Sequence, residues 1–556
     1  MKDFKKSTIY QIYPKSFYDS NNNGLGDLNG IKEKLPYLSH LGVDFIWITP
    51  FYISPGNDNG YDVADYINID PKFGTMKDFE ELVQKSKEYN IEIMLDMVFN
   101  HSSTEHEWFK KAISGDQHYK DYYIFKKPVD GREPTNWISK FGGSAWEYVE
   151  KFDEYYLSLF DKTQADLNWD NPNVRREIYE VVNFWLDKGV KGFRLDVINL
   201  ISKPEVYEDD YVGDGRRFYT DGPKVHEYLK ELNENTFGKR DGIITVGEMS
   251  STDIENCIRY SNPDENELTM TFNFHHLKVD YKDGEKWSLM DFDFIELKNI
   301  LNEWQIGMNE GGGWNALFWS NHDQPRIVSR IGDDKNYHQE SAKMLATTIH
   351  MMKGTPYIYQ GEEIGMTDPY LEKIEDYRDV ESINYYHILK EQGMAEEDII
   401  KILQSKSRDN SRTPMTWNDE SQSGFTNNHS PWISVNKNYK DINVRQSQED
   451  KDSVYYHYKK LIELRKQYDI IAYGDYTPIL EEHNGIFSYL RTYKDEILLV
   501  INNFYGENTD FNLPDVINPK EWKTSILTSN YKDSSTNIKE ISLRPYESIV
   551  YHLEKL

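Results

Sequence analysis

The chain has 556 residues, more than one hydrophobic core usually supports, so we expect two or three domains. Its formal net charge of −30 repels nucleic-acid phosphates and anionic lipids, so neither nucleic acid nor a membrane surface is an expected partner. The single cysteine, Cys257, excludes an intramolecular disulfide and a cysteine-cluster metal site. With no predicted membrane span or signal-peptide core, the protein is expected to be cytoplasmic.

Short apolar runs recur along the chain before residue 360. They are rich in β-branched and aromatic residues and are too short for helices, so each is predicted to be a buried parallel strand. In chain order the eight runs are Ile9–Tyr13, Val43–Thr49, Ile91–Phe99, Gly192–Val197, Ile243–Gly247, Thr269–Phe274, Ala316–Trp319 and Pro356–Tyr359.

Several segments between these strands have helical periodicity. In Met76–Tyr89 apolar side chains recur at helical spacing after Thr75, which can cap the helix. Val174–Lys188 repeats the pattern and is followed by Gly189, a residue typical of a helix end. This alternation predicts an α/β fold, a (β/α)8 TIM barrel whose chemistry lies at the C-terminal ends of the strands.

Two segments do not belong to a minimal barrel. The residues between Asn100 and Pro172, rich in Gly, Pro and Trp around Lys126–Trp146, are interpreted as a subdomain inserted after the third strand. After Gly474 the pattern changes to alternating strands, which predicts a C-terminal antiparallel β-sandwich domain. The predicted domains are the barrel at 1–101 and 172–474, the inserted subdomain at 102–171, and the C-terminal domain at 475–556.

Carboxylates accompany four of the predicted strands, at Asp96, Asp196, Glu248 and Asp323. Cleavage of a glycosidic bond needs one carboxyl group that donates a proton and another that attacks or activates water. A single acid after a strand is commonly a helix cap. Four of them, two closely preceded by Arg or His, favour a glycosidase.

The segments that carry these acids resemble glycoside hydrolase family 13, the α-amylase family. The resemblance covers nearly the whole chain, and the signature segments appear in the family's order. They are Asp96–His101, Gln164–Asn168, Gly192–Asn199, Glu248 and Asn321–Asp323. The resemblance implies a retaining hydrolase.

By this resemblance Asp196 would be the nucleophile, Glu248 the general acid/base, and Asp323 the group that stabilises the oxocarbenium-like transition state. Arg194 stands two residues before Asp196, on the same face of the strand, and favours the ionised carboxylate. Asp96 lies within its strand, and we expect it to hold Arg194 or a neighbouring backbone group rather than to act on the substrate.

Within the family the chain resembles the oligo-1,6-glucosidase-like branch, which takes short substrates from the non-reducing end. The segment Asn57–Asp62 resembles the one that closes the pocket there. Asp58 and Arg408 would clamp the terminal glucose, and Tyr61 would stack on it. The other substrate-binding residues that the resemblance implies are His101, Phe160, Gln164, Arg194, His322 and Arg412. For the two arginines near residue 410, a solvated loop is the alternative.

Four stretches resemble more narrowly the trehalose-6-phosphate hydrolases of this branch. They are Phe141–Glu147, Phe218–Pro223, Thr245–Ser251 and Phe272–Tyr281. In the last stretch His275 and Lys278 stand where oligo-1,6-glucosidases usually carry acidic residues. A phosphate dianion needs local positive charge in so acidic a chain, and Lys278 and Lys286 are the candidate phosphate ligands. An exposed surface cation is the alternative for each.

The implied reaction is hydrolysis of α,α-trehalose 6-phosphate to glucose and glucose 6-phosphate, so the expected partner is a small phosphorylated disaccharide. An oligo-1,6-glucosidase (isomaltase or dextran glucosidase) acting on short α-glucosides, and a transglycosylase or isomerase with the same acids, are the alternatives. A non-catalytic relative is disfavoured because all three acids are present. The sequence leaves the oligomeric state open, and we expect a monomer.

The segment Asp19–Asp27 spaces oxygen ligands two residues apart, as a tight calcium loop does. It resembles the calcium loop after the first strand in this branch. The implied ligands of a structural Ca²⁺ are Asp19, Asn21, Asn23, the Leu25 carbonyl and Asp27. Asn23 is commonly Asp in relatives, and a turn without an ion is the alternative. No organic cofactor is implied.

Overall fold

The computed structural model describes residues 2–427 and 430–556. The predicted strands form one 8-stranded parallel sheet in the order β13-β12-β11-β5-β2-β1-β15-β14. A parallel bridge between Thr271 and Asn315 joins the two outer strands, which closes the sheet into a barrel. The strands are β1 (Ile9–Ile12), β2 (Phe45–Ile48), β5 (Glu92–Met97), β11 (Gly192–Leu195), β12 (Ile244–Glu248), β13 (Met270–Phe272), β14 (Ala316–Leu317) and β15 (Thr355–Tyr359). The predicted (β/α)8 barrel is confirmed.

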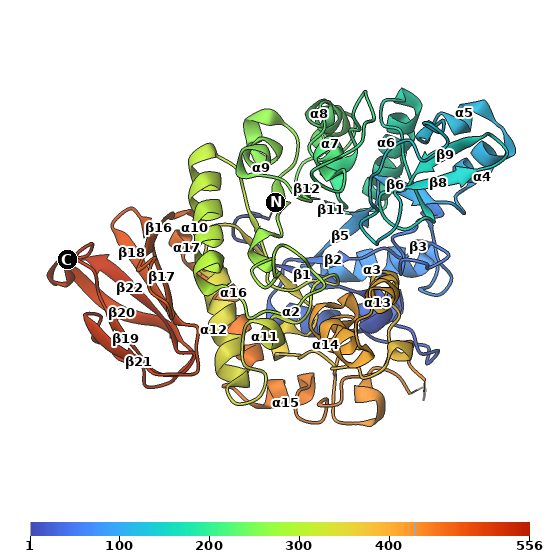
Figure 1. The fold of residues 1–556 in the computed structure, drawn as a ribbon. Helices are drawn as coiled ribbons and strands as arrows, with labels where there is room; N and C mark the ends of the chain where they lie inside the picture. Colours follow the sequence, from blue (N-terminus) through green and yellow to red (C-terminus); the bar gives the residue numbers. More distant parts are fainter. Residues whose placement is uncertain (1, 428–429) are drawn as a thin grey trace.

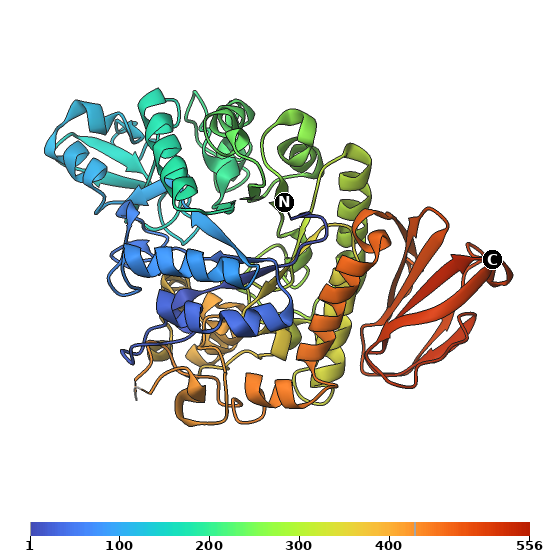
Figure 2. The same cartoon turned by 180° about the vertical axis from the view of Figure 1, so that it is seen from behind.

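Helices follow each strand and surround the barrel (Figures 1 and 2). In strand order they are α1 (Leu28–Glu33) with α2 (Leu35–Leu41), α3 (Met76–Glu88), α6 (Pro172–Asp187), α8 (Val225–Asn235), α9 (Ile254–Ser261), α10 (Phe294–Gly311), α12 (His338–His350) and α16 (Val454–Gln467). The helices predicted at 76–89 and 174–188 are confirmed as α3 and α6. Thr75 and Asp78 form the capping box that starts α3.

The remaining helices lie in the connections. They are α4 (Glu107–Ser114), α5 (Gln117–Lys120), α7 (Arg216–Tyr219), α11 (Ile327–Arg330), α13 (Val380–Glu391), α14 (Glu396–Lys406), α15 (Val444–Glu449) and α17 (Asp469–Tyr473). A small hairpin, β3 (Tyr52–Ile53) with β4 (Asp65–Ile69), follows β2. Over the described ranges, none of the helices combines the length and apolar character needed to cross a bilayer.

Between β5 and α6 the chain leaves the barrel and forms sheets of its own. β6 (His101–Ser103) pairs with β10 (Gln164–Asp166), and β9 (Glu154–Leu157) lies between β7 (Phe125–Lys126) and β8 (Trp146–Val149). A separate apolar cluster joins Trp137, Trp146 and Leu159 of this segment to Val197 and Tyr219, which follow β11. The insertion is therefore packed against the barrel loop that follows β11.

The C-terminal residues form an antiparallel module on the opposite side of the barrel from the insertion (Figures 1 and 2). Its larger sheet has the order β16-β17-β18-β22-β20, and β19 pairs with β21. One apolar cluster joins the two sheets, which confirms the predicted antiparallel domain. The strands are β16 (Asp475–Ile479), β17 (Ile486–Tyr493), β18 (Glu496–Asn503), β19 (Thr509–Asn512), β20 (Trp522–Ser529), β21 (Glu540–Leu543) and β22 (Ser548–Lys555). The residue limits given above for the three domains remain predictions.

A buried arginine ties this module to the barrel. Arg491 of β17 donates to the carbonyls of Met351 at 2.6 Å, Ile471 at 2.9 Å and Gly474 at 2.6 Å. Burial lowers the pKa of this guanidinium to about 10. Arg491 therefore supplies hydrogen bonds to these three backbone carbonyls, and the same hydrogen bonds stabilise the buried charge of Arg491.

Replacing this side chain tests the connection. Arg491→Met is expected to lower the free energy of unfolding by about 2–4 kcal/mol, because several buried carbonyls lose their donor. Urea unfolding followed by intrinsic fluorescence measures the change. Arg445→Met, which removes an exposed arginine that pairs with Asp419 and Glu420, is the control and should leave stability unchanged. Equal stability of the two variants would contradict the assigned role.

Candidate active site

A buried arginine lies at the centre of the candidate site. In the sheet, Arg194 of β11 is in register with Asp96 of β5. Its Nη1 lies 2.7 Å from Asp96 Oδ1 and 2.6 Å from Asp196 Oδ1, and its Nη2 contacts Glu248 Oε2. Burial alone would lower the pKa of the guanidinium, but the charges of Asp96, Tyr61 and Asp196 outweigh burial and raise it. One cation therefore holds carboxylates from three neighbouring strand ends.

Asp96 has no surface exposure and is fully engaged by protein groups. Besides Arg194, it accepts hydrogen bonds from Trp47 Nε1 at 3.1 Å and from the Tyr61 hydroxyl at 2.8 Å. The predicted contact between Asp96 and Arg194 is confirmed. The role of Asp96 is to position the guanidinium and the Tyr61 ring.

The chain turns sharply directly after Asp196. Val197 has a φ of 35°, a backbone conformation that a β-branched residue rarely adopts. Such strain persists where the surrounding structure enforces it, and it is concentrated at functional sites. Val197 lines the same pocket as Asp196, and the turn is buried against the inserted segment.

A second cationic cluster holds Asp323, which follows β14. Arg408 Nη1 lies 3.4 Å from Asp323 Oδ1, and Arg408 Nη2 lies 2.9 Å from Asp58 Oδ1 and 2.5 Å from Asp379 Oδ1. Arg412 Nη2 lies 2.8 Å from Asp323 Oδ1. Asp58 and Arg408, which sequence reasoning paired, are thus in direct contact. Asp379 was not predicted, since it starts helix α13 rather than following a strand.

The ionisation of Asp323 follows from this setting. Burial on its own would raise the pKa of the Asp323 carboxyl, but the neighbouring His322, Arg408 and Arg412 outweigh burial and hold that pKa well below its usual range. The carboxylate is therefore charged at neutral pH.

Two histidines and two glutamines support the groups that line the pocket. Gln11 Nε2 lies 2.7 Å from His322 Nδ1, which leaves the Nε2 of His322 as the protonated nitrogen, 3.2 Å from Asp323 Oδ2. Burial lowers the pKa of His322 to about 3, so the ring is neutral. Gln164 Nε2 donates to Asp58 Oδ2 at 3.0 Å and lies 3.2 Å from His101 Nε2. The Tyr61 ring stacks on His322 with centroids 5.1 Å apart.

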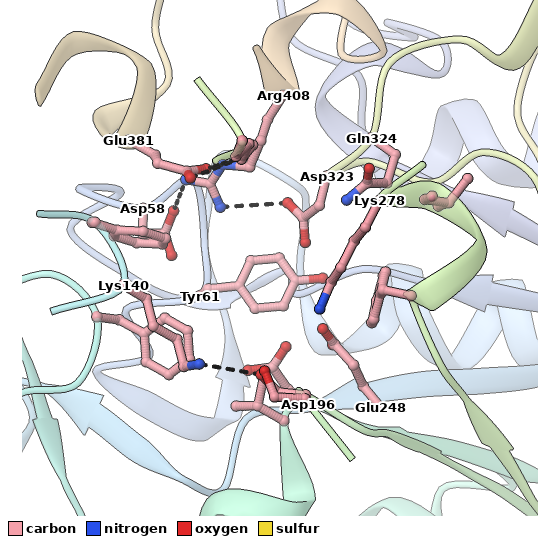
Figure 3. Close-up of a pocket in the computed structure, with 18 of the residues that line it drawn as sticks. Asp58, Tyr61, Lys140, Asp196, Glu248, Lys278, Asp323, Gln324, Glu381 and Arg408 are labelled. Carbon is pink, nitrogen blue, oxygen red and sulfur yellow. Dashed lines mark hydrogen bonds and ion pairs between the residues drawn. The ribbon is translucent and has the colours of Figure 1, made fainter. Parts of the chain in front are cut away.

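These groups converge on one cavity of about 240 Å³ (Figure 3). Of the predicted residues, its walls include Asp58, Tyr61, His101, Phe160, Asp196, Glu248, Lys278, Lys286, Asp323 and Arg408. Arg194, Gln164, His322 and Arg412 lie outside the wall and hold wall residues in place. The three acids therefore face one space, with Arg194 and Arg412 behind them and Arg408 in the wall itself.

Other wall residues were missed by sequence reasoning, including Lys140, Phe141, Gln324 and Glu381. Lys140 immediately precedes Phe141–Glu147, one of the stretches that carried the resemblance, so the sequence offered a way to find it. Glu381 belongs to α13, in a region without a strand end or motif to mark it.

The two predicted phosphate ligands differ in their surroundings. Lys286 Nζ lies 2.7 Å from Glu381 Oε2, so its charge is already paired. Within the described residues, the Lys278 ammonium has neither a hydrogen bond nor an ion pair. His275 packs near Trp304, and burial lowers its pKa to about 4, so it brings no positive charge at neutral pH. The basic character expected of this stretch therefore rests on Lys278.

The predicted calcium loop turns its side-chain oxygens toward its own backbone. Asp19 Oδ2 accepts from the Gly24 amide at 2.8 Å, and Asn23 Oδ1 accepts from the Leu25 amide at 2.8 Å. Asp27 caps α1 through the Gly30 amide. In the described part of the chain, no group of three or more His, Cys, Asp or Glu is placed to hold a metal. The donors are oxygens, which suits Ca²⁺, but only two are carboxylates.

Comparison with known proteins places this geometry in a family. The α-amylase catalytic domain matches residues 11–474, and the α-amylase SusG C-terminal domain matches residues 486–550. The trehalose-6-phosphate hydrolase of Bacillus subtilis (strain 168) is 58% identical over 99% of this chain and 98% of its own length. The oligo-1,6-glucosidase of Bacillus cereus is 51% identical over 99% of each chain.

A solved structure is similarly close. The crystal structure of Bacillus licheniformis trehalose-6-phosphate hydrolase superposes with a TM-score of 0.95 and 59% identity, over 99% of this chain and 100% of that one. The family signature and the full-length similarity agree with the convergent carboxylates at the barrel mouth. The chain belongs to the α-amylase family, glycoside hydrolase family 13, and is a glycoside hydrolase.

Proposed function

We propose that the protein hydrolyses α,α-trehalose 6-phosphate to glucose and glucose 6-phosphate, with retention at the anomeric carbon. The observation that carries the phosphate assignment is the Lys278 ammonium, which has no ion-pair partner among the described residues and lies in the wall of a pocket that also holds several carboxylates. Similarity to trehalose-6-phosphate hydrolases over the full length supports the same substrate.

The carboxylates divide the chemistry between them. Asp196, paired with Arg194 at 2.6 Å, attacks the anomeric carbon, and Glu248 protonates the leaving oxygen. The glucosyl–enzyme ester then reacts with water that Glu248 deprotonates, so two inversions give net retention. Asp323, charged and fixed by Arg412, stabilises the positive charge that develops on the sugar ring.

The closed end of the pocket selects a terminal glucose. Asp58 and Arg408 are paired at 2.9 Å and can share hydrogen bonds with sugar hydroxyls. Tyr61 is fixed by its hydroxyl bond to Asp96 and presents a ring to the cavity. The phosphorylated glucose would occupy the opposite end, where Lys278 lies.

A phosphorylated sugar arises inside cells, which supports a cytoplasmic location.

A substrate panel tests the assignment. The kcat/KM for trehalose 6-phosphate is expected to exceed that for isomaltose, maltose and trehalose by at least about tenfold, because one charge-assisted contact contributes this much. Product analysis with and without an acceptor sugar separates hydrolysis from transfer. Equal or greater activity on isomaltose would replace the proposed function with that of an oligo-1,6-glucosidase.

The role of Glu248 can be tested through the leaving group. In Glu248→Gln, kcat/KM for trehalose 6-phosphate is expected to fall about 10²–10⁴-fold, since the sugar oxygen leaves only when protonated. For α-glucosyl fluoride, whose leaving group needs little protonation, the loss should stay below about tenfold. Asp58→Asn, which alters the clamp on the terminal glucose that both substrates share, is the control and should lower both activities alike. Equal losses in Glu248→Gln would exclude the acid role.

We also propose that the loop of residues 19–27 holds a structural Ca²⁺ through Asp19, Asn21, Asn23, the Leu25 carbonyl and Asp27. An ion bound only by the folded state stabilises it. A chelator is therefore expected to lower Tm by at least about 3 °C, with Ca²⁺ restoring it. Scanning calorimetry in metal-free buffer measures this shift. An unchanged Tm would mean that the loop is stable without an ion.

A further inference from the structure

A second lysine reaches the same pocket from the inserted segment. Lys140 lies in the connection between β7 and β8, and its backbone amide donates to the Leu159 carbonyl at 2.9 Å. The preceding Ser139 hydroxyl donates to the Phe160 carbonyl. These bonds fix where the Lys140 side chain leaves the backbone, next to the pocket residues Phe141 and Phe160.

The Lys140 ammonium has a polar hydrogen-bond partner but no ion pair among the described residues. It donates to the Ser250 hydroxyl at 3.2 Å, and no carboxylate of the described residues lies within ion-pair distance of it. Ser250 follows β12 two residues after Glu248. Figure 3 shows Lys140 and Lys278 entering the pocket from opposite sides, with Asp196 between them.

The local charge balance favours an anion at this position. Burial lowers the pKa of Lys140 to about 7; the positive charges of Arg216 and Lys278 add to that shift, and Asp214 and Asp166, neither of which forms an ion pair with Lys140, oppose it. Arg216 is itself paired with Asp214 at 2.5 Å. Lys286, by contrast, is paired with Glu381. Among the three lysines in the pocket wall, Lys140 and Lys278 therefore lack a partner of opposite charge within the described residues.

We propose that Lys140 is a specificity-determining residue that binds the anionic end of the substrate together with Lys278. This inference rests on the proposed function. The phosphate would accept hydrogen bonds from both ammonium groups, and its charge would favour the protonated form of Lys140. The inserted segment and the loop after β13 would each contribute one cation, so the phosphate would bridge two parts of the fold.

The test compares Lys140→Met and Lys278→Met with the wild type on trehalose 6-phosphate and on 4-nitrophenyl α-glucoside. Each variant is expected to raise KM for trehalose 6-phosphate by about 10- to 100-fold. Both should keep kcat/KM for the uncharged aryl glucoside within about twofold, since the acids and the terminal-glucose clamp are untouched. Lys282→Met removes an exposed lysine of the loop after β13 and should change neither substrate.

Product inhibition gives a second readout. In Lys140→Met the inhibition constant for glucose 6-phosphate should rise by a similar factor, while that for glucose stays unchanged. Equal losses on both substrates would show that Lys140 positions Ser250 or its loop, and would overturn the proposal. So would an unaltered KM for trehalose 6-phosphate. If the wild type itself does not prefer trehalose 6-phosphate, the proposed function fails instead, which the same panel reveals.

Discussion

The candidate site depends on one buried guanidinium. Arg194 contacts Asp96, Asp196 and Glu248, which come from three adjacent strands of the barrel. A buried charge without partners costs several kcal/mol, so the cation and its carboxylates stabilise one another only when the strands are in register. The register that pairs Arg194 with Asp96 therefore brings the two reacting acids to the same guanidinium.

In the rest of the pocket a second arginine cluster, Arg408 and Arg412, likewise pairs buried positive charge with carboxylates. Arg408 and Arg412 come from far along the chain, yet both contact Asp323. Asp379 and Asp58 balance the extra positive charge. The acids Asp196, Glu248 and Asp323 thus face the pocket while Arg194 and Arg412 lie behind the wall, which keeps carboxylate oxygen atoms directed at a sugar. Such a cavity repels phosphate except where an unpaired ammonium projects into it, and this contrast gives Lys140 and Lys278 their importance.

The sequence predicted the barrel well because its strands are buried on both faces and are therefore continuous apolar runs. It also located the acids, since the parallel topology brings strand ends to one face. It did not locate Lys140, Asp379 or Glu381, which lie in an inserted loop and at the start of α13, where no periodic pattern marks a position. Nor could it show that His275 is neutral or that Lys286 is paired with Glu381, because both follow from tertiary contacts.

The central claim is that the Arg194 network presents Asp196 as the nucleophile. The most direct measurement is mechanism-based labelling with 5-fluoro-α-glucosyl fluoride, followed by peptide mass spectrometry of the trapped enzyme. The account predicts stoichiometric inactivation and a single fluoroglucosyl ester on Asp196. An ester on Glu248 or Asp323, or turnover without any covalent adduct, would contradict it.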